Sequence, residues 1–241
     1  MARVFLAGAS GIIGQRLIPL LVRAGHAVTG TTRSAERVDL LRELGSTPCV
    51  VEAFDGAALE RAVAEAAPEV VIHQLTNLPD RLFSLDPEAL ERAIRGNAQM
   101  RTEGTRHLVS AATAAGARRL VAQSILWIYA PGREPHVETD PVNTGATGLA
   151  AITVQGTVAL ERGVLGAAME SVVLRYGWLY GPGTGRDTSW KDPAVHVDAA
   201  AHAAFLAVSR GSGPYNAAEA SPYASSDRAR RELGWSPDFR L

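Results

Sequence analysis

The stretch that decides the fold is RVFLAGASGIIGQRLIPLLVRAG, Arg3 to Gly25. It begins as an apolar, strand-like run, passes through three glycines spaced three apart, and continues as an amphipathic helix that ends at a glycine. Gly8 permits a tight turn, Gly11 lets the backbone approach a bound group, and Gly14 lets the helix pack closely on a sheet. A strand, a glycine turn and a helix N-terminus in this order predict a binding site for a dinucleotide pyrophosphate.

The rest of the chain alternates between apolar runs and helical stretches. The expected strands are His26–Thr32, Thr47–Glu52, Glu69–Leu75, Arg119–Tyr129 and Glu170–Gly181. The expected helices between them are Ser34–Gly45, Gly56–Ala67, Glu88–Ala115 and Leu149–Gly163. Because the runs are apolar throughout rather than alternating, both faces of the sheet are expected to be covered. We predict an α/β fold with a doubly wound parallel sheet (a Rossmann fold), as one domain over residues 1–241. Its cofactor half is about 1–125 and its substrate-facing half about 126–241.

Composition narrows the classes of partner. A net charge of −1 argues against nucleic acid or an acidic membrane as a partner. The single cysteine, Cys49, excludes an internal disulfide framework, and we expect no metal site. The opening apolar run is short and broken by glycines, so we expect neither a signal peptide nor an anchor, and a cytoplasmic protein. The expected partner is a small molecule, bound by a monomer or homodimer.

The end of the second expected strand distinguishes between the two nicotinamide dinucleotides. An NAD site usually has an acidic residue there, but this segment reads GTTRS, Gly30 to Ser34. Arg33, Ser34 and Arg37 instead suit a ribose 2′-phosphate, because the arginine fork matches phosphate oxygens. NADP(H) is therefore the predicted cofactor. The alternative is that Arg33 is an exposed loop charge without a ligand.

Several further motifs carry a resemblance to a known family. They are GASGIIG, FDGAAL, VVIHQLTN, Asn97 with the helix that follows it, LRYGWLYGPGTG, VHVDAAAHA and ARRELGWSPDF. Over nearly its whole length the chain resembles the extended and atypical short-chain dehydrogenases/reductases of the epimerase/dehydratase branch. The resemblance implies that the glycine loop, including Ser10, Ile12 and Ile13, holds the cofactor. It implies further cofactor contacts at Asp55, Gln74, Leu75, Thr76, Asn97, Thr157, Tyr176 and Gly177. It also implies that the Ser124 hydroxyl binds the substrate carbonyl oxygen.

The helix LAAITVQGTVALERG, 149–163, departs from the family pattern. When it is aligned on Glu161, Thr153 and Thr157 stand where the family has its Tyr-x-x-x-Lys dyad. A threonine hydroxyl is a much weaker acid than a tyrosine phenol. Thr153 is nevertheless a candidate to polarise a carbonyl group by hydrogen bonding. The alternative is that both hydroxyls bond to backbone carbonyls one turn earlier.

The resemblance implies an NADPH-dependent ketoreductase that lacks a side-chain acid. The chain is similar to the angucyclinone ketoreductases that tailor antibiotics, so the expected substrate is a bulky, polycyclic aromatic polyketide ketone. Water or a substrate hydroxyl would supply the proton, with Tyr129, Tyr176 and Tyr180 as substitute donors. Trp127 and Trp178 are candidates for an aromatic wall. Two alternatives are a non-catalytic NADP(H)-binding redox regulator and, with less support, a sugar-nucleotide epimerase or dehydratase.

Overall fold

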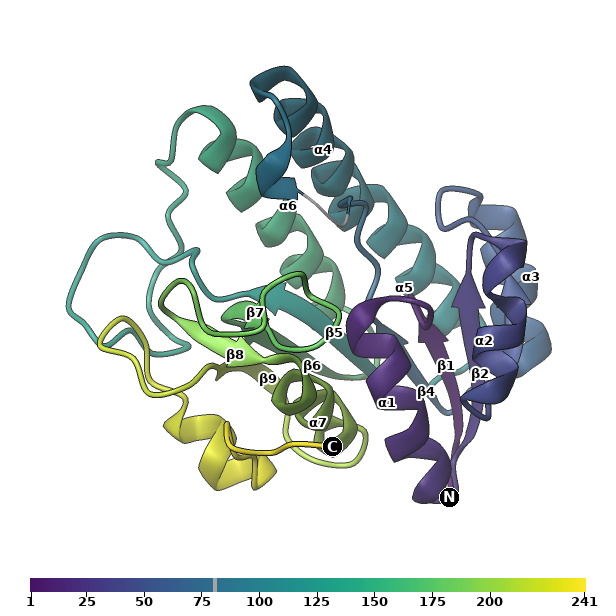
Figure 1. The fold of residues 1–241 in the computed structure, drawn as a ribbon. Coiled ribbons are helices and arrows are strands. Elements are labelled where there is room, and N and C mark those ends of the chain that lie inside the picture. The colour runs from purple at the N-terminus through teal and green to yellow at the C-terminus, as the bar shows by residue number, and fades with distance from the viewer. Residues whose placement is uncertain (80–81) are drawn as a thin grey trace.

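A seven-stranded parallel sheet forms the centre of the molecule, in the order β3-β2-β1-β4-β5-β6-β9 (Figure 1). The structure is a computed structural model, and it describes residues 1–79 and 82–241. The strands of this sheet are β1 (Arg3–Ala7), β2 (Ala27–Thr32), β3 (Thr47–Val50), β4 (Val70–His73), β5 (Arg119–Ile125), β6 (Glu170–Tyr176) and β9 (Gly213–Ala217). From β1 the chain adds β2 and β3 on one side and then β4, β5, β6 and β9 on the other side, with all strands parallel. The predicted doubly wound parallel sheet is therefore confirmed.

Helices cover both faces of the sheet. They are α1 (Ile12–Arg23), α2 (Val38–Glu43), α3 (Gly56–Ala66), α4 (Pro87–Gln99), α5 (Thr105–Ala114), α6 (Gly148–Leu165) and α7 (Val197–Ala207). Short 3₁₀ turns lie at Ala35–Arg37 and Leu82–Ser84, and π-helical turns lie at Met100–Gly104 and Ala229–Leu233. Helices α1 and α7 pack together on one face, while α3, α5 and α6 lie on the other (Figure 1).

Strand β1 shows why its sequence is apolar at successive positions. Val4 and Leu6 belong to the hydrophobic cluster under α1 and α7, whereas Phe5 and Ala7 belong to the cluster under α3, α5 and α6. Side chains alternate across a strand, so a sheet covered on both faces needs apolar residues at every position.

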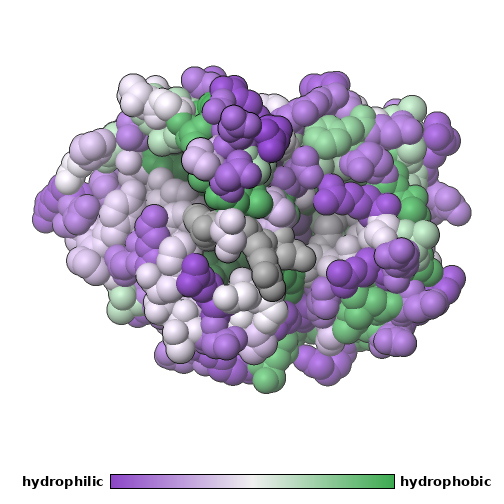
Figure 2. Space-filling view, turned by 45° about the horizontal axis from the view of Figure 1, so that its top comes forward, coloured by the Kyte–Doolittle hydropathy of each residue, from purple (hydrophilic) through white to green (hydrophobic). Residues whose placement is uncertain are grey.

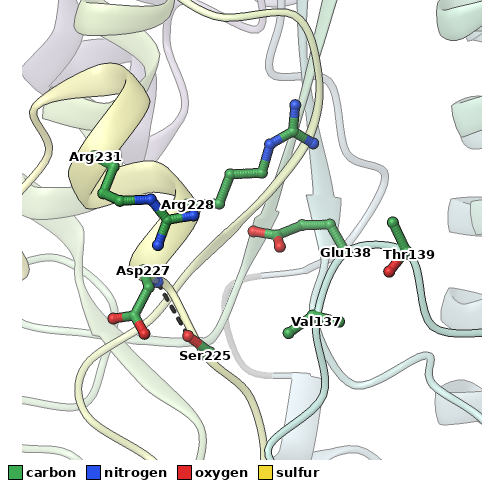
Figure 3. Close-up of a pocket in the computed structure, with 7 residues that line it drawn as sticks. All are labelled: Val137, Glu138, Thr139, Ser225, Asp227, Arg228 and Arg231. Atoms are coloured by element: carbon green, nitrogen blue, oxygen red, sulfur yellow. Dashed lines mark hydrogen bonds between the residues drawn. The ribbon is translucent and has the colours of Figure 1, made fainter.

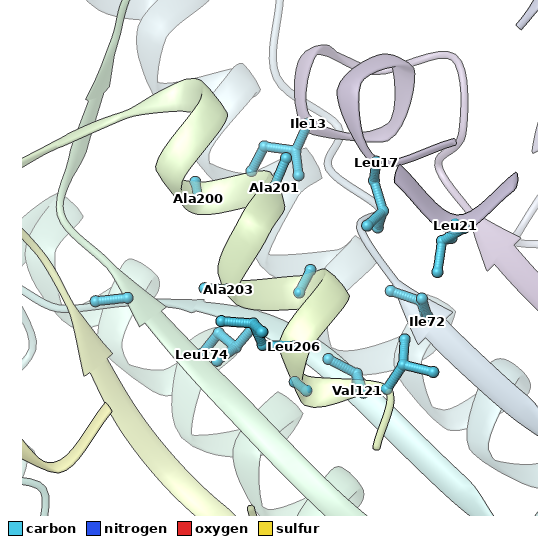
Figure 4. Close-up of a cluster of buried hydrophobic side chains, with 14 of the residues drawn as sticks. Ile13, Leu17, Leu21, Ile72, Val121, Leu174, Ala200, Ala201, Ala203 and Leu206 are labelled. Carbon is cyan, nitrogen blue, oxygen red and sulfur yellow. The ribbon is translucent and has the colours of Figure 1, made fainter. Parts of the chain in front are cut away.

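Alanines let helix α7 lie close to helix α1. Ile13, Leu17 and Leu21 point from α1 toward Ala200, Ala201 and the following turns of α7 (Figure 4). These side chains are all at most 5% exposed. This packing fixes the position of the first turn of α1, and the glycine loop leads directly into that turn.

Two expected elements are interrupted. The strand expected over 170–181 ends at Tyr176, and β7 (Trp178–Tyr180) pairs instead with β8 (Ala194–His196) in a separate two-stranded sheet. At the break, a Cβ on Gly177 would lie 2.7 Å from the Pro193 carbonyl oxygen, so only glycine fits where the chain crosses over. The helix expected over 88–115 contains the π-helical turn between α4 and α5.

Two glycines of α6 differ in their surroundings, which gives a test of the packing. A Cβ on Gly156 would lie 3.0 Å from Ala98 Cα of α4, whereas the nearest atom to a Cβ on Gly163 is Thr105 Cγ2 at 3.7 Å. We expect Gly156→Ala to lower the free energy of unfolding by about 1 kcal/mol or more through overpacking. Gly163→Ala should raise it by up to about 1 kcal/mol through helix propensity. Urea denaturation measures both, and shifts of the same sign and size would contradict the close α4–α6 contact.

Candidate active site

The glycine loop at the carboxyl end of β1 has the shape that a pyrophosphate requires. Gly8 has a φ of +84°, and a Cβ there would lie 2.5 Å from the Gln74 carbonyl oxygen. A Cβ on Gly14 would lie 2.4 Å from the Ala9 carbonyl oxygen. Gly11 precedes α1 without a side-chain cap on the helix, so the first amides of α1 are not satisfied by a side chain. These amides and the positive end of the helix dipole fit a phosphate group.

Of the loop residues predicted to bind cofactor, Ile13 can do so only through its backbone. Its side chain is 5% exposed and packs against α7 (Figure 4). Ser10 donates from its hydroxyl to Thr32 Oγ1 at 3.1 Å, which ties the loop to the end of β2. The Gly8 amide donates to Thr31 Oγ1 at 3.0 Å and makes a second tie.

Two arginines lie past the end of β2. Arg33 and Arg37 are both exposed, and Arg33 Nη1 donates to Asn77 Oδ1 at 3.0 Å. The backbone amide of Ser34 donates to Thr32 Oγ1 at 3.2 Å and shapes the turn between them. The residues present here therefore fit a 2′-phosphate better than a free ribose 2′-hydroxyl.

The segment that leaves β4 lies beside the glycine loop, because Gly8 packs against the Gln74 carbonyl. His73 is buried: its Nδ1 accepts from the Leu75 amide at 3.2 Å, and its Nε2 then donates to Thr105 Oγ1 at 2.9 Å. Burial, together with the nearby charge of Arg101, lowers the pKa of His73 to about 4, so the ring is neutral. Neither polar atom of the buried Gln74 amide makes a well-formed hydrogen bond with the described residues. The Gln74 side chain lies near the Tyr176 hydroxyl, and an amide left in that state can bond to a ligand at the end of β4.

The other residues predicted to contact cofactor have separate surroundings. Asp55 is exposed and caps α3 by accepting from the Ala58 amide at 2.9 Å. Asn97 is buried and accepts from the Asn77 amide at 2.9 Å. Thr76 is exposed and Leu75 is half-buried.

Tyr176 and Gly177 contribute to packing rather than to an open surface. The Tyr176 ring is 3% exposed within the core cluster, and its hydroxyl donates to the Ala200 carbonyl at 3.0 Å. Burial raises the pKa of Tyr176, which also disfavours it as a proton donor. Gly177 lies against the Pro193 carbonyl. A cofactor contact by the Tyr176 side chain would require the core to open.

Both threonines of α6 bond to the helix backbone. Thr153 Oγ1 donates to the Leu149 carbonyl at 3.2 Å, and Thr157 Oγ1 donates to the Thr153 carbonyl at 2.8 Å. Thr157 is fully buried, whereas Thr153 is half-buried. The oxygen of Thr157 also accepts from Arg101 Nη1 at 2.9 Å. Positions 153 and 157 therefore carry no carboxylate, imidazole or phenol, although Glu161 follows one turn later, and the Arg101 guanidinium of the π-helical turn bonds to Thr157.

Glu161 organises the polar interior behind this face. Its Oε1 accepts from the Ser124 hydroxyl at 2.6 Å and from Arg175 Nε at 2.9 Å, and its Oε2 accepts from Arg175 Nη2 at 2.6 Å. All three side chains are buried. The single hydroxyl proton of Ser124 is used in this bond, so Ser124 can bind a substrate carbonyl only if that bond is exchanged. Its predicted role stays a prediction.

The two other candidate tyrosines also have acceptors within the protein. The Tyr129 hydroxyl donates to Asn216 Oδ1 at 2.7 Å and accepts from Arg175 Nη1 at 2.8 Å. The Tyr180 hydroxyl donates to Glu219. Burial raises the pKa of both phenols. The hydrogen-bond partners of these two tyrosines could not be predicted from the sequence, because each partner lies at least 39 positions away along the chain.

Three tryptophans gather past the ends of β5 and β6: Trp127 follows β5, Trp178 begins β7, and Trp190 lies in the loop between β7 and β8. Trp127 and Trp178 are stacked with ring centroids 3.7 Å apart, and Trp190 meets Trp178 edge-on at 5.4 Å. Lys191 Nζ lies 4.2 Å from the centroid of the Trp178 ring, and Arg186 lies over Trp190. The two candidate wall residues thus contact each other, Trp190 extends the group, and their role as a wall for substrate stays a prediction.

A separate cavity of about 340 Å³ lies between the long loop after β5 and the C-terminal segment (Figure 3). Residues that line it include Val137, Glu138, Asp227, Arg228 and Arg231. In the loop after β5, the Glu138 carboxylate accepts a hydrogen bond from the backbone amide of Asn216 at 2.8 Å. None of the residues predicted to bind cofactor or substrate lines this cavity.

The outer surface agrees with a protein that binds a small molecule. When the top of Figure 1 is turned forward, hydrophilic side chains dominate the visible face and apolar ones form separate patches (Figure 2). Among the described helices, none combines the length and apolar character needed to cross a membrane.

This sheet, with its glycine loop at the carboxyl end of β1, defines a dinucleotide-binding protein. Residues 8–203 match the family described as NAD(P)H-binding, and the chain belongs to that family. It is 46% identical to a 3-diazoavenalumate denitrifying reductase from a Streptomyces species over 186 residues, which cover 76% of this chain and 58% of that protein. It is 34% identical to a dTDP-4-dehydrorhamnose reductase of Streptomyces griseus over 184 residues, or 75% and 51% of the two chains. The chain thus spans little more than half the length of these curated relatives.

The solved structures that it resembles share the fold. A UDP-glucose 4-epimerase from Thermotoga maritima, solved with UDP-glucose, superposes with a TM-score of 0.75 at 18% identity, over 99% of this chain and 94% of that one. Bordetella bronchiseptica WbmG, solved with NAD and UDP, gives a TM-score of 0.73 at 18% identity, over 100% and 90%. The predicted nicotinamide dinucleotide cofactor is thus supported by the family and by the fold.

Removing the charge of Glu161 tests the buried network. In Glu161→Gln the Arg175 guanidinium keeps its burial but loses the carboxylate. We expect the free energy of unfolding to fall by about 3–5 kcal/mol, because an uncompensated buried charge is costly. Glu91→Gln, which breaks an exposed pair with Arg95 on α4, should change it by less than about 1 kcal/mol. Similar losses in urea denaturation for the two variants would contradict the assigned burial.

The neutral His73 ring predicts a pH dependence of stability. A folded pKa of about 4 lies below the unfolded value near 6.5, so the unfolded chain binds more protons between these limits. Stability is therefore lost as the pH falls through this window, by about 1.5 kcal/mol from pH 6.5 to pH 5. We expect His73→Gln to lose correspondingly less over that interval in denaturant titrations. An unchanged pH dependence would show that His73 is not the responsible group.

Proposed function

We propose that the protein is an NADPH-dependent reductase that delivers hydride to a ketone on a bulky, planar aromatic substrate such as a polycyclic polyketide, in antibiotic tailoring. The observation that carries this proposal is in α6, where Thr153 and Thr157 donate to backbone carbonyls and neither position has a side-chain acid, while the nearby Glu161 carboxylate is paired with Arg175. A substrate that carries its own phenol, or that takes its proton from water, needs no such acid.

Different residues of the site would bind different parts of the cofactor. The Gly8–Gly14 loop and the start of α1 would hold the pyrophosphate, and Arg33 with Arg37 would hold the 2′-phosphate. When bound, the cofactor supplies the hydride. The stacked pair Trp127 and Trp178 supports a flat ring system as substrate, because aromatic rings pack favourably in offset or edge-on contacts.

The proposal is tested with purified protein, NADPH and a panel of angucyclinone-like ketones and quinones. Loss of NADPH absorbance with formation of an alcohol, identified by mass, is the expected result. Binding of NADPH without reduction of any member would favour the alternative of a redox-sensing regulator. Conversion of a nucleotide sugar but not of the aromatic ketones would favour an epimerase or dehydratase.

A second candidate function rests on the relative that is 46% identical, whose name describes a denitrifying reductase of a diazo compound. Hydride transfer to an arenediazonium ion forms a C–H bond, breaks the C–N bond and releases N₂. The products are neutral and no proton is consumed, so this reaction also needs no acid on α6. Detection of N₂ with an aromatic diazo acid, set against alcohol formation with ketones, distinguishes the two.

The choice of dinucleotide has its own prediction. We expect Arg33→Ala to raise the dissociation constant of NADPH about ten- to a hundredfold, as the loss of a charge-assisted contact implies, and to leave that of NADH nearly unchanged. Arg92→Ala, which removes an exposed arginine paired with Glu88 on α4, is the control and should change neither. Fluorescence titration measures all of these values. An equal effect of Arg33→Ala on NADPH and NADH would argue against a 2′-phosphate site.

A further inference from the structure

We propose that Arg101 is the electrophile of the reaction site: its guanidinium binds the acceptor oxygen of the substrate and stabilises the negative charge that hydride delivery leaves there. This inference rests on the proposed ketone reduction and assigns the group that replaces a side-chain acid. It rests on the position of Arg101, its hydrogen bonds and the charges around it.

The helix that carries Arg101 follows the segment leaving β4. Thr105 of this helix bonds to His73, the last residue of β4, at 2.9 Å. Two turns earlier, Asn97 bonds to the backbone of Asn77 at 2.9 Å, four residues beyond that strand. Arg101 lies midway between Asn97 and Thr105, so it stands over the carboxyl edge of the sheet, alongside residues 74–76. Gln74, in that segment, is the residue against which Gly8 packs.

The π-helical turn brings the guanidinium to α6. Arg101 lies within Met100–Gly104, and its Nη1 donates to Thr157 Oγ1 at 2.9 Å. Because Thr157 donates its own proton to the Thr153 carbonyl, its oxygen is oriented to accept from the arginine. Single π-turns within α-helices occur frequently at functional sites. The contact places a positive charge beside the half-buried Thr153.

Most donors of Arg101 remain available. A guanidinium has five N–H groups, and over residues 1–79 and 82–241 Thr157 is the one hydrogen-bond acceptor of Arg101. Arg175 provides the contrast, since it bonds to both oxygens of Glu161, to the Tyr129 hydroxyl and to the Glu138 carbonyl. Glu161 is thus paired with Arg175, and the charge of Arg101 is not cancelled by an ion pair within the described residues.

The charge of Arg101 persists at neutral pH. Burial lowers its pKa to about 10, against the opposing attraction of Glu161, so the group stays protonated. Its charge also reaches His73, where it adds to burial, the larger cause, in lowering the pKa of that ring.

The reaction balances with this assignment. Hydride, which bound NADPH would supply, would add to the carbonyl carbon, and the C=O π electrons would move to oxygen and leave an alkoxide. The guanidinium N–H groups hold that oxygen as its charge develops, in the manner of an oxyanion site. Water or a substrate phenol then protonates the alkoxide, so Arg101 loses no proton.

The test measures binding as well as turnover. The variants are Arg101→Met, which removes the charge, Arg101→Lys, which keeps it, and Arg106→Met, an exposed control on α5. The probes are 2-anthracenecarboxylate, an anion in the place of the alkoxide, and its neutral carboxamide, each titrated by fluorescence into the NADP⁺ complex. Circular dichroism and urea denaturation monitor the fold of each variant.

We expect Arg101→Met to weaken the carboxylate at least about tenfold and the carboxamide less than twofold, while NADPH binding persists. Turnover of the ketone should fall about 10²- to 10³-fold, as for loss of an oxyanion donor. Arg101→Lys should recover carboxylate binding in part, and Arg106→Met should behave as the wild type. Wild-type protein that prefers the carboxamide, or Arg101→Met that binds the carboxylate normally, would overturn the assignment. Failure of the wild type to bind NADPH would instead defeat the proposed function itself.

Discussion

The buried carboxylate of Glu161 connects the elements around the candidate site. It accepts hydrogen bonds from Ser124 of β5 and Arg175 of β6 while standing on α6. A buried carboxylate is tolerated only when its charge is paired and its lone pairs are satisfied, so these elements are constrained to one relative position. The arrangement uses the Ser124 proton and the whole Arg175 guanidinium. The two arginines therefore differ: Arg175 is paired with the Glu161 carboxylate, whereas Arg101 bonds to the Thr157 hydroxyl and keeps an unpaired charge within the described residues.

That separation gives the site an unusual chemical character. Proton transfer from a side chain needs a group whose pKa lies near the working pH, and positions 153 and 157 of α6 offer only threonine hydroxyls. A fixed positive charge stabilises developing negative charge without transferring a proton. The same face can therefore serve a reduction whose proton comes from elsewhere, and the stacked tryptophans favour a planar acceptor. The aromatic and cationic character of the site supports a ketone more directly than a cationic diazonium ion.

Much of the fold could be predicted from the sequence because its signals are local. The apolar runs, the glycine spacing and the missing carboxylate after β2 are each visible within a few residues. The parallel, doubly wound arrangement followed from the alternation of apolar runs and helices, whereas the order of the strands comes from the structure. The break at Gly177 was missed, since the Pro193 carbonyl that excludes a side chain lies 16 residues further along the chain. The resemblance implied a cofactor contact at Tyr176, which stays a prediction, and only the structure shows that the core packs its ring against α7.

The sequence by itself determined the parallel sheet and the dinucleotide loop, and it places threonines at positions 153 and 157 of α6. Only the tertiary structure decided what surrounds those threonines. Arg101 meets Thr157 across 56 positions of sequence, and Ser124 meets Glu161 across 37. Such pairings depend on the register between packed helices and on a π-turn, and a displacement of one residue would turn these side chains toward other partners. The residue type limits the chemistry that a side chain can perform, and the packing of the elements decides which partner that side chain contacts.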